Sequence, residues 1–390
     1  MKVISKHLLI TLLLIGLTAS AQEPSRQTVT LPSTYETVTV RPVGGTKVRN
    51  VVLMIGDGMS LAHIAALRTV NKGNINLSNA QATGLVITTA LDKLVTDSAA
   101  AATAMSTGHK ARYHTLAVDS LDRPYATIID YAHSAGLGTG VISTCRLYDA
   151  TPAAFLAHST EREAPYEIIG QFPDSHCDLI MGGGAKVFAD RPDGRNIFQE
   201  MKEKGYRVTR SLKDFAAGEK SSSGRELCVY AEKDVPVPLE RGELLSHASR
   251  LALDHLAKQT PEGFFLMIEG SQLDDYGHTN DLDLLMQETA DFDRAIGAVM
   301  KWAEEDGETL VIVTADHETG GLTVLGGDEE KGEVEGNFST GGHSGVLVPI
   351  YLYGPSSDYF TGIYHNTEIY HKVMHLLGLS ERCTHETARP

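Results

Sequence analysis

Acidic residues and histidines follow short apolar runs at several places along the chain. Asp57 comes directly after VVLMIG, and TADHETGG places Asp316 beside His317 after LVIVT. The segment GGHSG adds His343 shortly before another apolar run. Carboxylates and imidazoles are the ligands that zinc and magnesium bind in proteins. The pattern therefore indicates a metal site at which oxygen and nitrogen ligands converge.

The segment IEGSQLDDYGH supplies four more residues of this kind: Glu269, Asp274, Asp275 and His278. Asp274 and His278 are four residues apart, so both can face one metal if the segment is helical. Taken alone, each candidate could be a helix cap or an ordinary loop residue. Four separate apolar runs with ligand-type residues at one end are hard to attribute to packing, and this favours one shared site.

A possible nucleophile lies in VTDSAAAATAMSTG, where Ser98 precedes a run of alanines. Alanine is the strongest helix former, and Asp97 and Ser98 are both good N-cap residues, so a helix is expected to begin here. The N-terminus of a helix favours an anion, which suits a hydroxyl that attacks a phosphate. On these residues alone, a plain N-cap serine is the simpler interpretation.

The elements that must position these residues alternate along the chain. The buried strands are expected at 51–55, 139–143, 178–181, 264–268, 310–314 and 349–353, and the helices at 125–135, 244–258, 282–305 and 367–377. Alternating strands and helices predict an α/β protein, a three-layer α/β/α sandwich around a mostly parallel sheet. In such folds the functional groups gather at the carboxyl ends of the strands.

The N-terminus has the layout of a secretory signal peptide. Lys2 and Lys6 precede a short apolar stretch, and Ala19-Ser20-Ala21 fits a cleavage site, so 1–21 is expected to be removed. The protein is then expected to be exported, periplasmic or extracellular, with no membrane anchor. Residues 22–390 are expected to form a single catalytic domain, with a peripheral excursion from the sheet at about 191–239.

Charge and cysteine content narrow the class of partner. The formal net charge is −16, which makes nucleic acid an unexpected specific partner. The four cysteines, Cys145, Cys177, Cys228 and Cys383, lack the spacing of a zinc knuckle. In an oxidising compartment they could form up to two disulfides, and the sequence does not choose among the pairings.

Several of these segments together resemble one enzyme family. VTDSAAAATAMSTG, IGDGM, STCRLYDATPAAFLAHSTER, IEGSQLDDYGH, TADHETGG and GGHSGVLVPIYLYGP are similar, in this order, to motifs of the alkaline phosphatases. The resemblance runs from about 51 to 379 and leaves mainly 191–239 unmatched. It implies an alkaline phosphatase-like fold and a phosphomonoesterase that uses a phosphoserine intermediate, two Zn²⁺ and one Mg²⁺, with a homodimer as a possible assembly.

The resemblance also implies a role for individual residues. Ser98 would be the nucleophile, and Arg162 would hold two phosphate oxygens while Asp97 orients it. The implied metal ligands are Asp274, His278 and His343 for one zinc; Asp57, Asp316, His317 and Ser98 for the second; and Asp57, Thr151 and Glu269 for magnesium, with Asp149 beside them. Two metals about 4 Å apart can stabilise the attacking and the leaving oxygen.

Asp275 departs from the family pattern. The best-known members carry a basic residue or a histidine directly after the position of Asp274, whereas Asp149 is retained as a carboxylate. We expect the additional negative charge to change which metal the magnesium site prefers and how product phosphate is held.

Two other functions remain open from the sequence. A phosphodiesterase of the same superfamily is one, but such relatives usually lack Arg162 and the magnesium ligands Thr151 and Glu269. A non-catalytic metal- or phosphate-binding protein is the other, but it would have no need of Ser98. Small-molecule phosphate monoesters are therefore the expected substrates.

Overall fold

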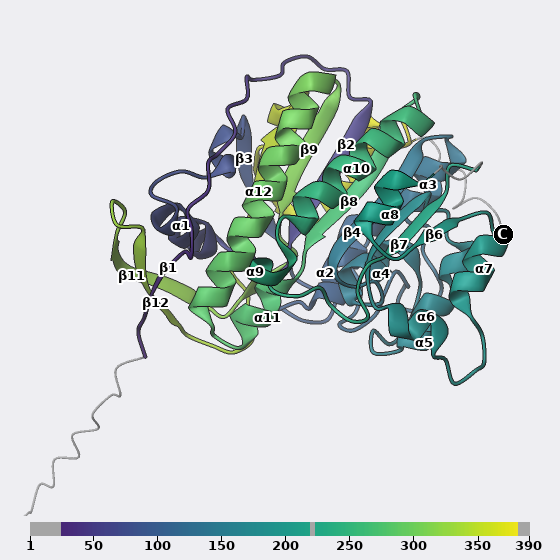
Figure 1. Cartoon of the computed structure of the whole chain (residues 1–390), viewed down its shortest axis with the longest axis horizontal. Coiled ribbons are helices and arrows are strands. Elements are labelled where there is room, and N and C mark those ends of the chain that lie inside the picture. Colours follow the sequence, from purple (N-terminus) through teal and green to yellow (C-terminus); the bar gives the residue numbers. More distant parts are fainter. Residues whose placement is uncertain (1–24, 219–222, 381–390) are drawn as a thin grey trace, which may run out of the picture.

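The computed structural model describes residues 25–218 and 223–380 (Figure 1). The signal peptide expected over 1–21 and Cys383 lie outside the described residues. No helix within those two described ranges is long and apolar enough to cross a membrane.

A ten-stranded sheet forms the centre of the described part of the chain. From one edge to the other its strands are β15 (Gly362–His365), β3 (Ala82–Ile87), β14 (Val348–Tyr353), β9 (Thr309–Thr314), β2 (Asn50–Gly56), β8 (Phe264–Gly270), β4 (Gly138–Arg146), β5 (Leu179–Gly183), β7 (Glu226–Val229) and β6 (Arg207–Thr209). The pairings are parallel except those of β14, which is antiparallel to both neighbours. The six predicted strands and the mostly parallel sheet are confirmed.

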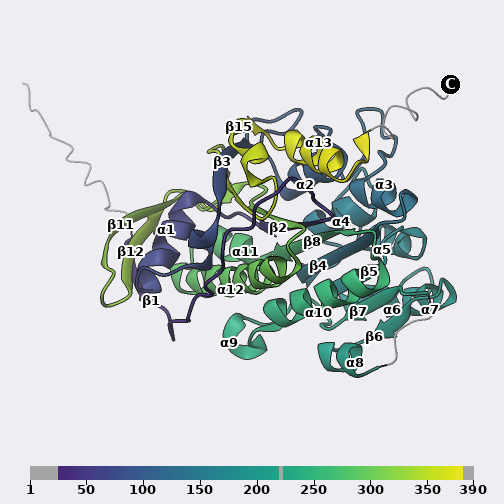
Figure 2. The same ribbon diagram turned by 90° about the horizontal axis from the view of Figure 1, so that it is seen from above.

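Helices cover both faces of this sheet, as Figure 2 shows from above. One face carries α10 (Leu244–Gln259) and α12 (Leu282–Asp306), and the other carries α2 (Ser98–Thr107), α3 (Ile128–Ser134), α4 (Ala150–Leu156) and α13 (Thr367–Leu376). Because both faces are covered, every residue of β2 and of β8 is buried, which explains their unbroken apolar sequences. The three-layer α/β/α sandwich is confirmed.

Two smaller sheets and several short helices complete the fold. The strands are β1 (Gln27–Thr30), β12 (Glu333–Phe338) and β11 (Leu322–Asp328) in one sheet, and β10 (Glu318–Thr319) and β13 (His343–Ser344) in the other. The helices are α1 (Leu61–Val70), α5 (Pro165–Gly170), α6 (Ala185–Ala189), α7 (Ile197–Glu203), α8 (Leu212–Ala217), α9 (Pro238–Arg241) and α11 (Gln272–His278), with 3₁₀ turns at Asn76–Asn79, Phe172–Asp174 and Ser357–Phe360.

The segment 191–239, expected as an excursion from the sheet, contributes to it. Its strands β7 and β6 extend the parallel sheet beyond β5, and α7 and α8 lie beside them. The short length of both strands hid them in a polar stretch of sequence. The expectation that residues 22–390 form a single catalytic domain stays a prediction.

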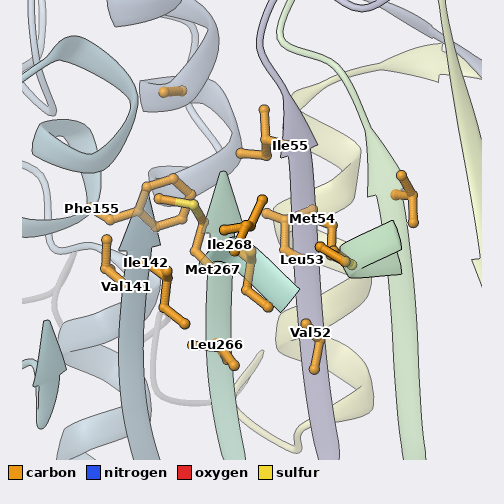
Figure 3. Close-up of a cluster of buried hydrophobic side chains, with 14 of the residues drawn as sticks. Val52, Leu53, Met54, Ile55, Val141, Ile142, Phe155, Leu266, Met267 and Ile268 are labelled. Atoms are coloured by element: carbon orange, nitrogen blue, oxygen red, sulfur yellow. The ribbon is translucent and has the colours of Figure 1, made fainter. Parts of the chain in front are cut away.

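The apolar core lies around the central strands. Figure 3 shows side chains of β2, β4 and β8 together with Phe155, which α4 contributes. Phe155 stacks on Phe265 with 6.2 Å between the ring centroids. Cys145, Cys177 and Cys228 are also buried, and all three are free thiols. This packing fixes the strand ends from which the candidate functional residues emerge.

Candidate active site

The strand ends that carry the predicted ligands lie side by side. Ile55 of β2 is in register with Glu269 of β8 on one side and with Thr314 of β9 on the other. Asp57 comes two residues after Ile55 and Asp316 two residues after Thr314, so both emerge at the same edge of the sheet as Glu269. Sheet register therefore brings together carboxylates that are more than 200 residues apart in the chain.

A first cluster consists of Asp57, Asp316 and His317, whose ligand atoms lie within 4.8 Å of one another. His317 Nε2 is 3.1 Å from Asp316 Oδ2 and 3.5 Å from Asp57 Oδ1. Burial and the nearby Asp316 carboxylate raise the pKa of Asp57 well above its usual range. Asp57 Oδ1 and Asp316 Oδ2 are buried, and neither accepts a hydrogen bond from the described residues. Buried oxygens of this kind fit a cation.

A second cluster brings together Asp274, His278 and His343. His278 Nε2 lies 3.2 Å from Asp274 Oδ2 and 3.1 Å from His343 Nε2. Pairing of β13 with β10 places His343 opposite Thr319 and stacks its ring on His317. The ligand atoms of Asp274, His317 and His343 also lie within 4.8 Å of one another, so the two clusters are contiguous.

The tautomers of the two histidines follow from their partners. His278 Nδ1 lies 2.9 Å from the Gly341 carbonyl, and His343 Nδ1 lies 2.8 Å from the Thr96 carbonyl. A carbonyl can only accept, so each Nδ1 carries a proton, and in their neutral forms the two rings present bare Nε2 atoms to each other. Two nitrogen lone pairs at 3.1 Å repel unless a cation or a proton lies between them. Carbonyl groups that orient imidazoles in this way are typical of metal sites.

A third group lies on the other side of Asp57. Thr151 Oγ1 is 3.5 Å from Asp57 Oδ2, and Glu269 Oε2 accepts a 2.5 Å hydrogen bond from Ser143. Burial raises the pKa of Glu269 to about 8, although the Ser143 hydroxyl opposes this shift. Glu269 Oε1 is buried and accepts no hydrogen bond from the described residues. The oxygen-only donors here suit a hard cation such as magnesium.

Ser98 is the first residue of α2, not its cap. Asp97 is the N-cap, and its carboxylate accepts from the Ala100 amide at 3.2 Å. The interpretation of Ser98 as a plain N-cap serine is therefore wrong. Its hydroxyl is buried and lies 3.1 Å from His317 Nε2, directly beside the first cluster.

Arg162 reaches the same place from the loop after α4. Its Nη1 is 3.1 Å from Asp97 Oδ2, and its Nη2 is 3.3 Å from Asp149 Oδ1. The two carboxylates hold the planar guanidinium from separate elements, and each occupies only one of its nitrogen atoms. Donors of the fork remain for a bound anion.

Ser98 and Arg162 open into one polar cavity of about 330 Å³, whose wall also includes Asp57, Arg146, Tyr148, Asp149, Glu163, Pro165, Ser271, Asp274 and Asp275. Partial desolvation and the Asp274 carboxylate raise the pKa of Asp275 to about 6. The cavity thus joins a hydroxyl, an arginine and the carboxylate–histidine clusters.

Thr319 and Gly58 also contribute to the site, although no motif in the sequence indicates a role for their contact. Thr319 donates a hydrogen bond to Asp274 Oδ1 and lies 3.2 Å from His317 Nδ1. Gly58 makes this approach possible: its φ is +70°, and a Cβ there would stand 2.7 Å from Thr319 Oγ1. This contact between Gly58 and Thr319 arises from the tertiary fold, since the two residues are far apart in the sequence.

An open, mostly parallel sheet whose strand ends gather carboxylates, histidines and a serine around one cavity defines an α/β enzyme with a metal-binding site. The family model for alkaline phosphatase matches residues 48–335. The chain belongs to the alkaline phosphatase family and is a phosphoric monoester hydrolase.

Known relatives agree with this assignment. Alkaline phosphatase 3 of Bacillus subtilis is 31% identical over 85% of this chain and 89% of its own length. Streptomycin-6-phosphate phosphatase of Streptomyces griseus is 32% identical, with 86% and 92% coverage. The structure of the alkaline phosphatase of the Antarctic bacterium TAB5 matches with a TM-score of 0.80 and 35% identity, covering 85% of this chain and 98% of that one. A mutant of that enzyme is described with Mg bound in its M3 site.

Proposed function

We propose that the protein is an exported phosphomonoesterase that works through a phosphoserine at Ser98. The observation that carries this proposal is the position of the Ser98 hydroxyl. It does not cap α2, it lies 3.1 Å from His317 Nε2, and it lines the same cavity as Arg162. The N-terminus of α2 adds unpaired amide groups and a positive partial charge at the same point.

Two displacements at phosphorus describe the reaction. Ser98 Oγ forms a bond to phosphorus while the ester P–O bond breaks, and the alcohol leaves. Water then attacks the phosphoserine, the bond from phosphorus to Ser98 Oγ breaks, and phosphate is released with the hydroxyl restored. Phosphoryl transfer depends mainly on positioning and charge compensation, so the residues around Ser98 determine the rate.

Arg162 binds the non-bridging oxygens of the phosphate. Its fork matches two oxygens, and the ion pairs with Asp97 and Asp149 fix its direction. Because Asp97 also caps α2, one carboxylate orients both the nucleophile's helix and the arginine.

The donor sets fit three metal ions. Zinc would be held by Asp274, His278 and His343, and a second zinc by Asp57, Asp316, His317 and Ser98; magnesium would be held by Asp57, Thr151 and Glu269, with Asp149 nearby. When bound, these ions compensate the negative charge of the attacking and leaving oxygens. The facing Nε2 atoms and the buried carboxylate oxygens without donors support this assignment.

Replacing Arg162 with alanine is expected to lower kcat/KM for an aryl phosphate monoester by about 10- to 100-fold, the value of a paired charge-assisted hydrogen bond. The loss for the matching aryl diester is expected to be smaller, because a diester presents fewer free oxygens and less charge. The measurement is steady-state kinetics on both substrates, and the wild type is expected to prefer the monoester strongly. The comparison tests both the proposed function and the role of Arg162.

Arg146→Ala is the matched control for that experiment. Arg146 lines the same cavity and also pairs with Asp149, at 2.6 Å, but has no assigned contact with phosphate. We expect it to affect monoester and diester equally. If Arg162→Ala lowers kcat/KM equally for the monoester and the diester, Arg162 does not bind the phosphate oxygens. A wild-type preference for the diester would overturn the proposed function.

Asp275→Lys is expected to raise the magnesium concentration needed for half-activation by roughly tenfold and to tighten inhibition by phosphate by a similar factor. Asp275 shares the cavity wall with Asp149 and Asp274. Replacing its negative charge with a positive one changes the net charge beside the magnesium ligands by two units. The measurement is a magnesium titration of the metal-depleted enzyme, together with phosphate inhibition constants.

The Asp275→Asn variant separates charge from side-chain shape and is expected to fall between wild type and the lysine variant. Identical magnesium dependence and phosphate inhibition in all three proteins would show that Asp275 does not influence the site.

Export and self-association complete the proposal. Cleavage near Ala21 would release the chain into the periplasm or the medium. A homodimer, which the family resemblance implies, stays a prediction. Exposed apolar side chains of Leu61, Val346 and Leu347 around one surface pocket offer a surface for it.

A further inference from the structure

Arg241, at the end of α9, is a buried arginine outside the proposed metal and phosphate sites. Only 2% of its side chain is exposed. Its Nη1 donates to Gln272 Oε1 at 2.9 Å, and to Glu288 Oε1 at 2.8 Å, while its Nη2 donates to Glu288 Oε2 and Asp291 Oδ2, both at 2.7 Å. One guanidinium therefore connects α9 with α11 and α12.

Gln272 is the first residue of α11, and both ends of its amide bond to the chain before α10. Its Oε1 accepts from Arg241, and its Nε2 donates to the Val235 carbonyl at 2.8 Å. The same helix carries Asp274 two residues and His278 six residues further on. The contacts of Gln272 are thus the nearest side-chain anchor of these two ligands on the N-terminal side.

The geometry of α11 depends on such anchors. It has seven residues and no side-chain cap at Ser271, and a helix of this length is not stable by itself. At the other end, Gly277 lies against Thr319, whose hydroxyl bonds to Asp274. Tertiary contacts at both ends therefore determine where its side chains point.

The segment that holds Arg241 is fixed to the central sheet. Gly184 donates to the Lys233 carbonyl at 3.0 Å, and Val235 donates to the Thr144 carbonyl at 3.2 Å. A Cβ on Gly183 would stand 2.0 Å from the Lys233 oxygen, so only glycine permits this approach. The glycine run at 182–184 therefore allows the segment before α9 to pack closely against the end of β5.

The charges around Arg241 make it difficult to replace. Glu288 and Asp291 have side chains that are 1% and 0% exposed. Burial raises the pKa of Glu288 to about 7, although Arg241 opposes the shift. Among the described residues, removing the arginine leaves two buried carboxylates with Arg294, 3.5 Å from Asp291, as the cation paired with them.

We propose that Arg241 is a positioning residue that, through Gln272, holds α11 so that Asp274 and His278 converge with His343 on one metal. This inference rests on the proposed function, which assigns these three residues to zinc. Its effect is on metal affinity: a helix that is free to shift must be ordered again when zinc binds, and this weakens binding.

The test measures zinc affinity by competition with a chromophoric chelator, and thermal unfolding of the metal-free protein, for four variants. We expect Gln272→Met, which leaves the Arg241 ion pairs in place, to weaken zinc binding at the tightest site by about tenfold with little change in unfolding temperature. Arg241→Met is expected to weaken it by about 10- to 100-fold, and Arg241→Lys to recover part of the loss because it restores the charge without the fork.

Arg207→Met is the matched control. Arg207 forms an ion pair with the buried Glu226 at 2.8 Å, but it lies on β6, the outermost strand of the sheet, and its side chain is 18% exposed. We expect this variant to unfold at a lower temperature and to bind zinc like the wild type.

Wild-type zinc affinity in Gln272→Met would overturn the inference, even if Arg241→Met did not fold. A loss of affinity in Arg207→Met equal to that in Arg241→Met would also overturn it, because general destabilisation would then explain the effect. Failure of the wild type itself to bind zinc, with monoester turnover intact, would instead contradict the proposed metal centre.

Discussion

Replacing Ser98 with alanine is expected to lower kcat for an aryl phosphate monoester by about 10³- to 10⁵-fold, because the variant has no nucleophile on the protein. Arg162 and both carboxylate–histidine clusters remain, so direct attack by water leaves a small residual rate. Metal content is expected to stay close to that of the wild type. The measurement combines kinetics with metal analysis of the purified variant.

A trapping experiment tests the covalent step separately. Wild type mixed with labelled monoester and quenched in acid is expected to retain label on Ser98, and Ser98→Ala is expected to retain none. Ser106→Ala controls for damage to α2: Ser106 is buried on the same helix and donates to the Ala154 carbonyl at 2.7 Å. Near-normal turnover by the Ser98 variant, or wild type that never carries label, would contradict the phosphoserine mechanism.

Removing divalent metals with a chelator is expected to lower monoester turnover by about 10³-fold or more, since such ions contribute several kcal/mol to transition-state stabilisation. Zinc and magnesium together are expected to restore activity, and magnesium alone is not. The chemistry of the donors gives the reason: the histidine-containing clusters suit zinc, whereas the Thr151–Glu269 group offers only oxygen.

Metal removal is also expected to lower the unfolding temperature. Binding at a hundredfold excess over Kd adds about 2.7 kcal/mol for one site. Without metal, Asp57 Oδ1, Asp316 Oδ2 and Glu269 Oε1 stay buried without donors. Full activity in a protein shown by elemental analysis to contain no metal would contradict the metal assignment, as would unchanged unfolding temperatures with and without zinc.

The local elements were largely predictable from the sequence. Unbroken apolar runs such as VVLMI are typical of strands buried on both faces. The alanines after Asp97 predict a helix because alanine has the highest helix propensity. The helix expected at 125–135 begins at Ile128, because Thr127 and Asp130 cap it reciprocally. Deviations of this size arise at element ends, where side-chain caps compete with apolar periodicity.

Sheet order was less accessible. The antiparallel direction of β14 and the two edge strands β7 and β6 depend on which segments pair, and pairing partners are distant in sequence. A strand of three or four residues in a polar stretch has no periodicity long enough to recognise. The excursion expected at 191–239 therefore concealed part of the sheet.

The sequence by itself determined the chemical inventory: a serine at a helix start, ligand-type residues after apolar runs, and an order of motifs that identifies the family. It could do so because residue type and short spacing are local properties. Only the tertiary structure decided which groups meet, such as the His278 and His343 nitrogens at 3.1 Å and the hydrogen bond from Arg241 to Gln272. Those contacts depend on strand register and on loops that close over the strand ends, and neither is encoded in any single segment.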